Sequence, residues 1–123
     1  VSSAEADIEL HVSTSVYDRV IVWRDTTESI VPEYARPVVH VLATRAIELN
    51  DHSPFFPQDR IVERLAESGI SRTQQAVSKT LNALERQWGL IKIVDLGKQP
   101  DGRLNPRAYR LCIDGEPISE VLK

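Results

Sequence analysis

The stretch that most constrains the fold is SRTQQAVSKTLNALERQWGLI, which spans residues 71–91. Four of its apolar residues, Val77, Leu81, Leu84 and Trp88, are separated by four, three and four positions. At about 100° per residue they fall within about 60° of arc, which is the buried stripe of an amphipathic helix. Gly89 ends this pattern and a short apolar run follows it. The segment therefore predicts a helix over residues 71–88 that leads directly into a strand.

The opposite side of this predicted helix is polar and basic. With Val77 set at 0°, five side chains lie at roughly 140° to 220°. They are Arg72, Gln75, Lys79, Asn82 and Arg86. Guanidinium and ammonium groups reach guanine O6 and N7, amides pair with adenine, and any basic group can hold a phosphate. Glu85 is the only acid between Arg72 and Lys92. We therefore expect this face to contact DNA, the alternative being an ordinary solvated helix face.

Two further helices are predicted before this one. An apolar stripe over residues 37–49 begins with a proline, which suits the first position of a helix. A second stripe predicts a helix over residues 57–68 that opens with Pro57, and the following Gly69 suits the left-handed position of a Schellman motif. Ser71 then begins a Ser-x-x-Gln capping box with Gln74. Two helices joined by so short a turn predict a helix-turn-helix.

A β-hairpin is predicted after the helix-turn-helix. Residues 90–96 form an apolar strand, and apolar and polar residues alternate again over residues 108–113. Between them lies the Pro/Gly-rich stretch GKQPDGRLNPR, residues 97–107, which carries Lys98, Arg103 and Arg107. The hairpin therefore has a long, basic tip.

The first 36 residues are predicted to form an N-terminal extension. Apolar and polar residues alternate over residues 8–12, which predicts a strand. Residues 16–23 are rich in β-branched side chains, which predicts a second strand. The alternative is a short helix from Ser13, because the apolar residues of this segment also fit helical spacing.

Charge is distributed unevenly along the chain. The net charge is −3. Residues 1–51 carry nine acids and four arginines, a balance of −5, whereas residues 72–110 carry eight basic residues and three acids, a balance of +5. Such a split suggests one face that suits a polyanion, although an ordinary solvated surface with an uneven composition is the alternative.

Residues 37–113 resemble a winged helix-turn-helix domain. The order is helix, helix, capped third helix, then a basic hairpin that closes with YRL. The stretch QQAVSKTLNALERQWGLIKIVDLGKQPDGRLNPRAYRL is similar to the recognition helix and wing of MarR-like and related bacterial or archaeal regulators. The resemblance implies an α+β fold with a three-helix core plus a β-hairpin wing, to which the N-terminal β-like extension is added. Residues 114–123 would be a C-terminal tail.

The resemblance also implies how the domain would bind. Residues 71–88 would lie in a major groove, and the wing, residues 97–107, along the backbone or in the adjacent minor groove. The predicted DNA-binding residues are Ser71, Arg72, Thr73, Gln75, Ser78, Lys79, Asn82, Arg86, Lys98, Arg103 and Arg107. We therefore expect a sequence-specific double-stranded DNA-binding transcriptional regulator. We also expect it to be a homodimer, through residues 8–24. In that segment, the side chains of Tyr17, Val20, Val22 and Trp23 could form the partner surface or could equally pack on the domain itself.

Two other functions remain open. The chain could be the DNA-binding winged helix of a larger replication or ATPase protein, which the missing initial Met and the short tail favour. It could instead be a winged helix used for protein–protein assembly, in keeping with the acidic N-terminal third. A gene that begins well upstream would support the former, and a lack of DNA binding the latter.

Enzyme, metal and cofactor chemistry are not expected. The chain has no phosphate-binding glycine loop, HExxH or GxSxG motif, and its three histidines are scattered. The single cysteine, Cys112, excludes an internal disulfide and is expected to be a small buried hydrophobe. No apolar run approaches the roughly 18 residues of a membrane span. A reduced, cytoplasmic setting fits these features best.

Overall fold

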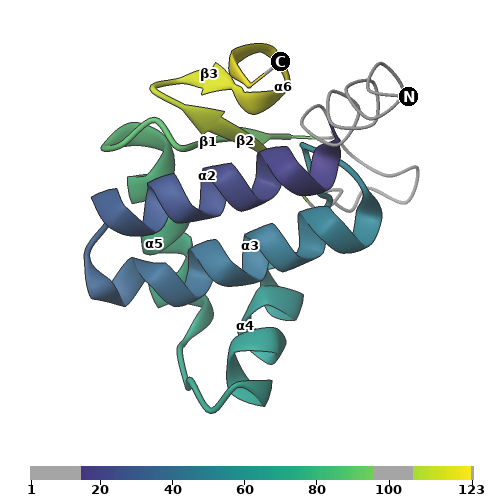
Figure 1. The fold of residues 1–123 in the computed structure, drawn as a ribbon. Helices are drawn as coiled ribbons and strands as arrows, with labels where there is room; N and C mark the ends of the chain where they lie inside the picture. The colour runs from purple at the N-terminus through teal and green to yellow at the C-terminus, as the bar shows by residue number, and fades with distance from the viewer. Residues whose placement is uncertain (1–14, 96–106, 123) are drawn as a thin grey trace, which may run out of the picture.

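The computed structural model describes residues 15–95 and 107–122 (Figure 1). The helical elements, in chain order, are α2 (Val16–Ile30), the 3-10 helix η1 (Glu33–Ala35), α3 (Arg36–Leu49), α4 (Gln58–Glu67), α5 (Gln74–Arg86) and α6 (Ile118–Val121). The strands are β1 (Ile91–Val94), β2 (Ala108–Ile113) and β3 (Glu116–Pro117), which form an antiparallel sheet in the order β1-β2-β3. The fold is therefore α+β, as expected.

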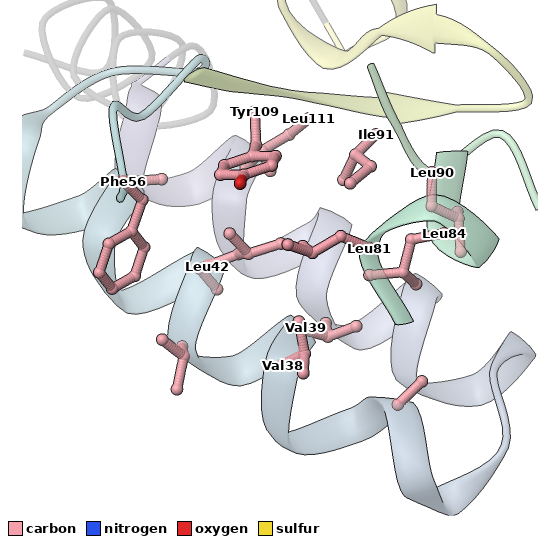
Figure 2. Packing of buried hydrophobic residues seen from close by; sticks show 14 of the residues in the cluster. Val38, Val39, Leu42, Phe56, Leu81, Leu84, Leu90, Ile91, Tyr109 and Leu111 are labelled. Carbon is pink, nitrogen blue, oxygen red and sulfur yellow. The ribbon is translucent and has the colours of Figure 1, made fainter. Parts of the chain in front are cut away.

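One hydrophobic core joins the helices to the sheet. Leu42 of α3, Leu81 of α5, and Tyr109 and Leu111 of β2 are all fully buried and belong to a single cluster (Figure 2). Because successive side chains of a strand point to opposite faces, Tyr109 and Leu111 share the face that turns toward the helices. The sheet thus covers one side of the helical layer.

The strand predicted for residues 16–23 is wrong, and the helical alternative is confirmed. Ser15 is the N-cap of α2, and its Oγ accepts a hydrogen bond from the backbone N–H of Asp18 at 3.1 Å. Val20 and Trp23 are fully buried. β-branched residues favour strands on average, but their spacing here places an apolar side of a helix against α3 and the sheet. The strand predicted over residues 8–12 lies outside the described residues.

The Trp23 indole ties α2 to the sheet. Just before β1, the N–H of Cys112 donates to the carbonyl of Leu90 at 2.8 Å. The reciprocal donor is missing, because the N–H of Leu90 donates to the carbonyl of Leu84 at the end of α5. Trp23 Nε1 donates to both the Leu90 and Cys112 carbonyls at 2.9 Å. The indole N–H therefore supplies the carbonyl of Cys112 with a donor in place of the N–H of Leu90, which is bound to Leu84.

The predicted helices at residues 37–49 and 57–68 are confirmed as α3 and α4. Asn50, at the end of α3, adopts the left-handed conformation with φ 51°. Pro57 is the N-cap of α4 rather than its first helical residue. Helix α3 therefore ends, and helix α4 begins, close to the residues that the sequence indicated.

The two predicted hairpin strands are confirmed as β1 and β2, and β1 is shorter than predicted. Of the predicted tip, residues 97–107, only Arg107 belongs to the described residues. On its other side, β2 bonds to the segment before α4, since the N–H groups of Tyr109 and Leu111 donate to the carbonyls of Pro54 and His52. The expected tail, residues 114–123, contains β3 and α6.

Candidate nucleic-acid interface

The turn between α4 and α5 is closed by the predicted Schellman motif. Gly69 has φ +83°, and its N–H donates to the carbonyl of Ala66 at 2.9 Å. The N–H of Ile70 donates to the carbonyl of Leu65 at 2.8 Å. These two bonds satisfy carbonyls at the end of α4 and turn the chain sharply toward α5. The turn places α5 against α4 and α3, as a helix-turn-helix requires.

Helix α5 buries one side and exposes the other, as predicted. Val77, Leu81 and Leu84 are buried, and Trp88, beyond the helix, is half-buried against the same cluster. The exposed side carries a second stripe with the spacing four, three and four. It consists of Gln75, Lys79, Asn82 and Arg86, all of which are exposed. This stripe is called the α5 polar face below, and it contains two cations, two amides and no acid.

The start of α5 differs from the prediction. Thr73, not Ser71, is the N-cap, and its Oγ1 accepts from the N–H of Ala76 at 3.1 Å. The predicted capping box of Ser71 with Gln74 is therefore wrong, because the chain is still in the turn at Ser71. Ser71 and Thr73 are exposed at this end of the helix, and Ser78 is half-buried.

Arg72 does not belong to the α5 polar face. It precedes the helix, is half-buried, and donates a hydrogen bond from its Nη1 to the carbonyl of Tyr34 in η1. Sequence spacing placed it on the helix because the start was set two residues too early. Arg72 instead lines an open hollow of about 570 Å³ beside Ser71, Thr73 and Lys79. Its guanidinium thus braces the turn and borders the exposed start of α5.

A pair of cations faces across the sheet beside α5. Lys92 of β1 is directly opposite Arg110 of β2 in the antiparallel register. Like charges at such positions repel each other, at a cost of a few tenths of a kcal/mol to about 1 kcal/mol. Arg107, just before β2, is exposed. The predicted wing residues Lys98 and Arg103 lie outside the described residues.

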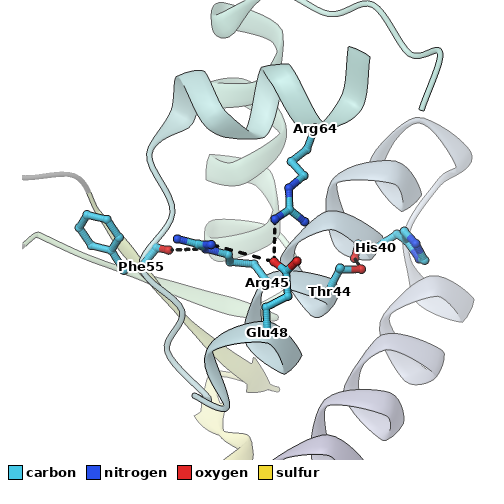
Figure 3. Close-up of polar contacts among 6 residues, drawn as sticks. All are labelled: His40, Thr44, Arg45, Glu48, Phe55 and Arg64. Carbon is cyan, nitrogen blue, oxygen red and sulfur yellow. Dashed lines mark hydrogen bonds and ion pairs between the residues drawn. The ribbon is translucent and has the colours of Figure 1, made fainter. Parts of the chain in front are cut away.

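Four of the described arginines are paired with acids, whereas others, such as Arg19 and Arg36, donate to backbone carbonyls instead. Arg45 and Arg64 converge on Glu48, with Arg64 Nη2 2.7 Å from its carboxylate (Figure 3). Arg24 and Arg60 are likewise paired with acids. Among the described residues, no carboxylate forms an ion pair with the cations of α5 and the neighbouring strands. These unpaired cations are Lys79, Arg86, Lys92, Arg107 and Arg110. Among the described residues, ion pairs therefore leave the positive charge of these five side chains uncompensated.

Glu85, the single acid of the 72–92 stretch, does not point to the α5 polar face. It is half-buried, and its Oε2 accepts a hydrogen bond from the backbone N–H of Ile93 in β1 at 2.8 Å. Sequence reasoning noted this acid only as an exception to the basic pattern. Its position on the helix, away from the basic stripe, was the one signal that could have indicated a different partner.

Cys112 is buried, as expected. Burial raises the pKa of its thiol, and the effect is opposed by the cations of Arg110 and Lys92 and reinforced by the Glu85 carboxylate. At neutral pH the group is therefore a protonated thiol, which suits a structural role and not a nucleophilic one.

A metal centre and a membrane span were also considered for the part of the chain that the structure describes. Within residues 15–95 and 107–122, no group of three or more His, Cys, Asp or Glu residues is arranged to hold a metal ion. No helix of the same residues is both long and apolar enough to cross a membrane. No protein-family model, curated protein or solved structure matches the chain.

Proposed function

We propose that this protein binds double-stranded DNA in a sequence-specific manner and acts as a transcriptional regulator. The observation that carries the proposal is the group of unpaired cations on α5 and the adjoining strands, in a chain that pairs several of its other arginines with acids. A polyanion would supply the missing counter-charge, and the phosphate backbone of DNA is a polyanion with regularly spaced charges.

The shape of the surface supports duplex DNA in particular. Helix α5 has 13 residues, and its exposed stripe alternates amides with cations. A single helix fits the major groove, where amides read adenine and cations read guanine or hold phosphates. In the proposed complex, Gln75 and Asn82 read bases, while Lys79 and Arg86 read guanine or hold phosphates. The wing then lies on the backbone or in the adjacent minor groove.

A dimer would extend the same mechanism. Two copies bound to half-sites one helical turn apart, or a multiple of it, would read a longer sequence. Val20 and Trp23, which were expected to contribute to the dimer surface, are buried in the chain's own core. Tyr17 and Val22 of α2 are 57% and 46% exposed, and a dimer through this helix would use these side chains.

The proposal is tested by fluorescence anisotropy with a mixed-sequence duplex at about 50 and 200 mM salt. The variant Lys79→Ala/Arg103→Ala removes one cation from α5 and one from the wing. We expect it to weaken binding and to reduce the slope of log K against log salt by about 2. The control is Arg24→Ala/Arg60→Ala, which removes two cations that are paired with acids. It changes the net charge equally and should leave the slope unchanged.

Sequence preference is tested separately with Gln75→Ala and Asn82→Ala. Each should alter the preferred sequence more than the affinity for mixed DNA, since an amide that reads a base contributes discrimination of about 1–3 kcal/mol. Equal losses in the Lys79/Arg103 variant and its control would contradict the proposed surface. No binding by the unmodified protein, even at the lower salt, would favour protein–protein assembly instead.

A further inference from the structure

Glu85 joins two elements that would touch the same duplex. It lies on α5 but bonds to the backbone of β1, eight residues further along the chain. The strand it holds is followed directly by the wing segment and carries Lys92. The contact is therefore a bridge between the helix that would read bases and the sheet that carries the other unpaired cations.

Within the described part of the sheet, the N–H of Ile93 points away from β2 and toward no other strand. The N–H groups of Tyr109 and Leu111 point away from β1, because they donate to the carbonyls of Pro54 and His52. Residues opposite each other in an antiparallel pair either exchange both bonds or neither. Ile93, opposite Tyr109, thus directs its N–H outward from the sheet, where β1 is the edge strand. The Glu85 carboxylate meets this donor at 2.8 Å.

Two hydrogen bonds join the end of α5 to β1 and the residue before it. The first lies in the turn, in which the N–H of Leu90 donates to the carbonyl of Leu84 at 2.9 Å. The second is the bond between Glu85 and Ile93. Gly89, with φ +63°, lies in this turn. β1 is also held by its pairing with β2 and by the buried side chain of Ile91. Removing the bond to Glu85 would therefore loosen the outer edge of β1 relative to α5 and leave the rest of the strand in place.

We propose that Glu85 is a positioning residue, whose carboxylate fixes β1 and its cation Lys92 relative to the polar face of α5. The inference rests on the proposed function, since the fixed angle is what lets one duplex meet both elements at the same time. Simultaneous contact makes the second set of interactions intramolecular, and this advantage is lost when the geometry is loose. Glu85 would thus support DNA binding by the basic side chains without contacting the DNA itself.

If Glu85 acted only through its charge, its removal would change the DNA affinity in the opposite direction. A carboxylate close to a phosphate-binding surface repels DNA, so its removal would tighten binding in any variant that lacks the charge. Glu85→Gln removes the charge and keeps an oxygen that can accept from Ile93. Glu85→Ala removes both. The positioning role therefore predicts that the two variants behave differently, and the electrostatic role predicts that they behave alike.

The experiment measures duplex affinity, salt slope and the exchange rate of the Ile93 amide hydrogen. We expect Glu85→Ala to bind about tenfold more weakly, which corresponds to the loss of one hydrogen bond, with a shallower salt slope and fast exchange at Ile93. Glu85→Gln should bind at least as tightly as the unmodified protein and keep Ile93 protected. Equal affinities of the Ala and Gln variants would overturn the proposal.

A second background separates positioning from general loss of structure. In a Lys92→Ala/Arg110→Ala protein, the cations that Glu85 would position are gone, so the further change Glu85→Ala should have little effect on affinity. An undiminished tenfold loss in that background would mean that Glu85 only supports the fold, and would overturn the positioning role. Failure of the unmodified protein to bind DNA would overturn it together with the proposed function. A protein that binds DNA but exchanges Ile93 rapidly would overturn the positioning role alone.

Discussion

Replacement of Trp23 by Phe tests whether α2 is an integral part of the core. The indole is fully buried, and its Nε1 donates to the carbonyls of Leu90 and Cys112. Phe keeps an aromatic ring but has no donor. Leu90 O retains the N–H of Cys112 as a partner. Among the described residues, no other donor reaches Cys112 O, because the N–H of Leu90 is bound to the carbonyl of Leu84. The substitution therefore leaves a buried carbonyl unpaired.

The magnitude follows from these contacts. A lost neutral hydrogen bond costs about 1 kcal/mol, and an unsatisfied buried acceptor costs about 1–3 kcal/mol. The smaller ring adds a packing defect, so we expect a total loss of about 2–4 kcal/mol. For a chain of 123 residues, this lowers Tm by about 8–16 °C at about 4 °C per kcal/mol. The loss is large compared with a total stability of about 5–15 kcal/mol.

Urea denaturation followed by far-UV circular dichroism provides the assay. With an m-value of about 2 kcal/mol/M, the midpoint should fall by about 1–2 M without a change in m. Tyr17→Phe is the matched control, because it removes a hydroxyl group from an aromatic side chain of the same helix that is 57% exposed. It should change stability by less than about 0.5 kcal/mol. Equal effects of the two substitutions would refute the docking of α2 on the sheet.

Two further predictions concern a close backbone approach and a histidine. A Cβ at Gly89 would lie 2.9 Å from the backbone nitrogen of Gly115, so Gly89→Ala should lower thermal stability by about 2–4 kcal/mol. Gly69→Ala, where nothing lies within 4 Å, should cost only the left-handed strain of about 1–2 kcal/mol, and an equal loss at both glycines would contradict the contact. Burial and then the Arg19 guanidinium lower the pKa of His52 below its ordinary value, against a smaller opposing effect of its acidic neighbour. The pKa of His52 is thus lower in the folded state than in the unfolded state. The contribution of neutral His52 to the free energy of unfolding is therefore present above about pH 6.5 and is lost as pH falls through the folded-state pKa. Urea titrations at about pH 7.5 and 5.5 should show that His52→Gln reduces this loss, and an unchanged difference would contradict it.

Local patterns in the sequence were sufficient to predict most elements after residue 36. The stripes of α3, α4 and α5 repeat with helical period, and Gly69 marks a turn that most other residues could enter only with strain. The exposed stripe of α5 followed from the same period, because the buried stripe determines where the opposite side lies. These features depend on residues that are close in sequence, so they can be predicted from the sequence alone.

Local patterns could not decide the structure of residues 16–30. Their β-branched side chains favour a strand, and their spacing also fits a helix, so the outcome depends on what they meet in space. Trp23 meets carbonyls 67 and 89 residues further along the chain. A helix places the indole under the sheet together with Val20, and the core that both fill selects the helix over the strand. Tertiary burial therefore outweighed local propensity.

The partners of individual charged groups were also decided by tertiary structure. By itself, the sequence determined that residues 72–110 are basic and that Glu85 is a lone acid on the third helix of the predicted domain. Only the fold directed Glu85 to the outward N–H of Ile93 and Arg72 to the carbonyl of Tyr34. The physical reason is that period and composition act along the chain. A hydrogen bond, in contrast, requires a donor and an acceptor brought within about 3 Å by the packing of separate elements.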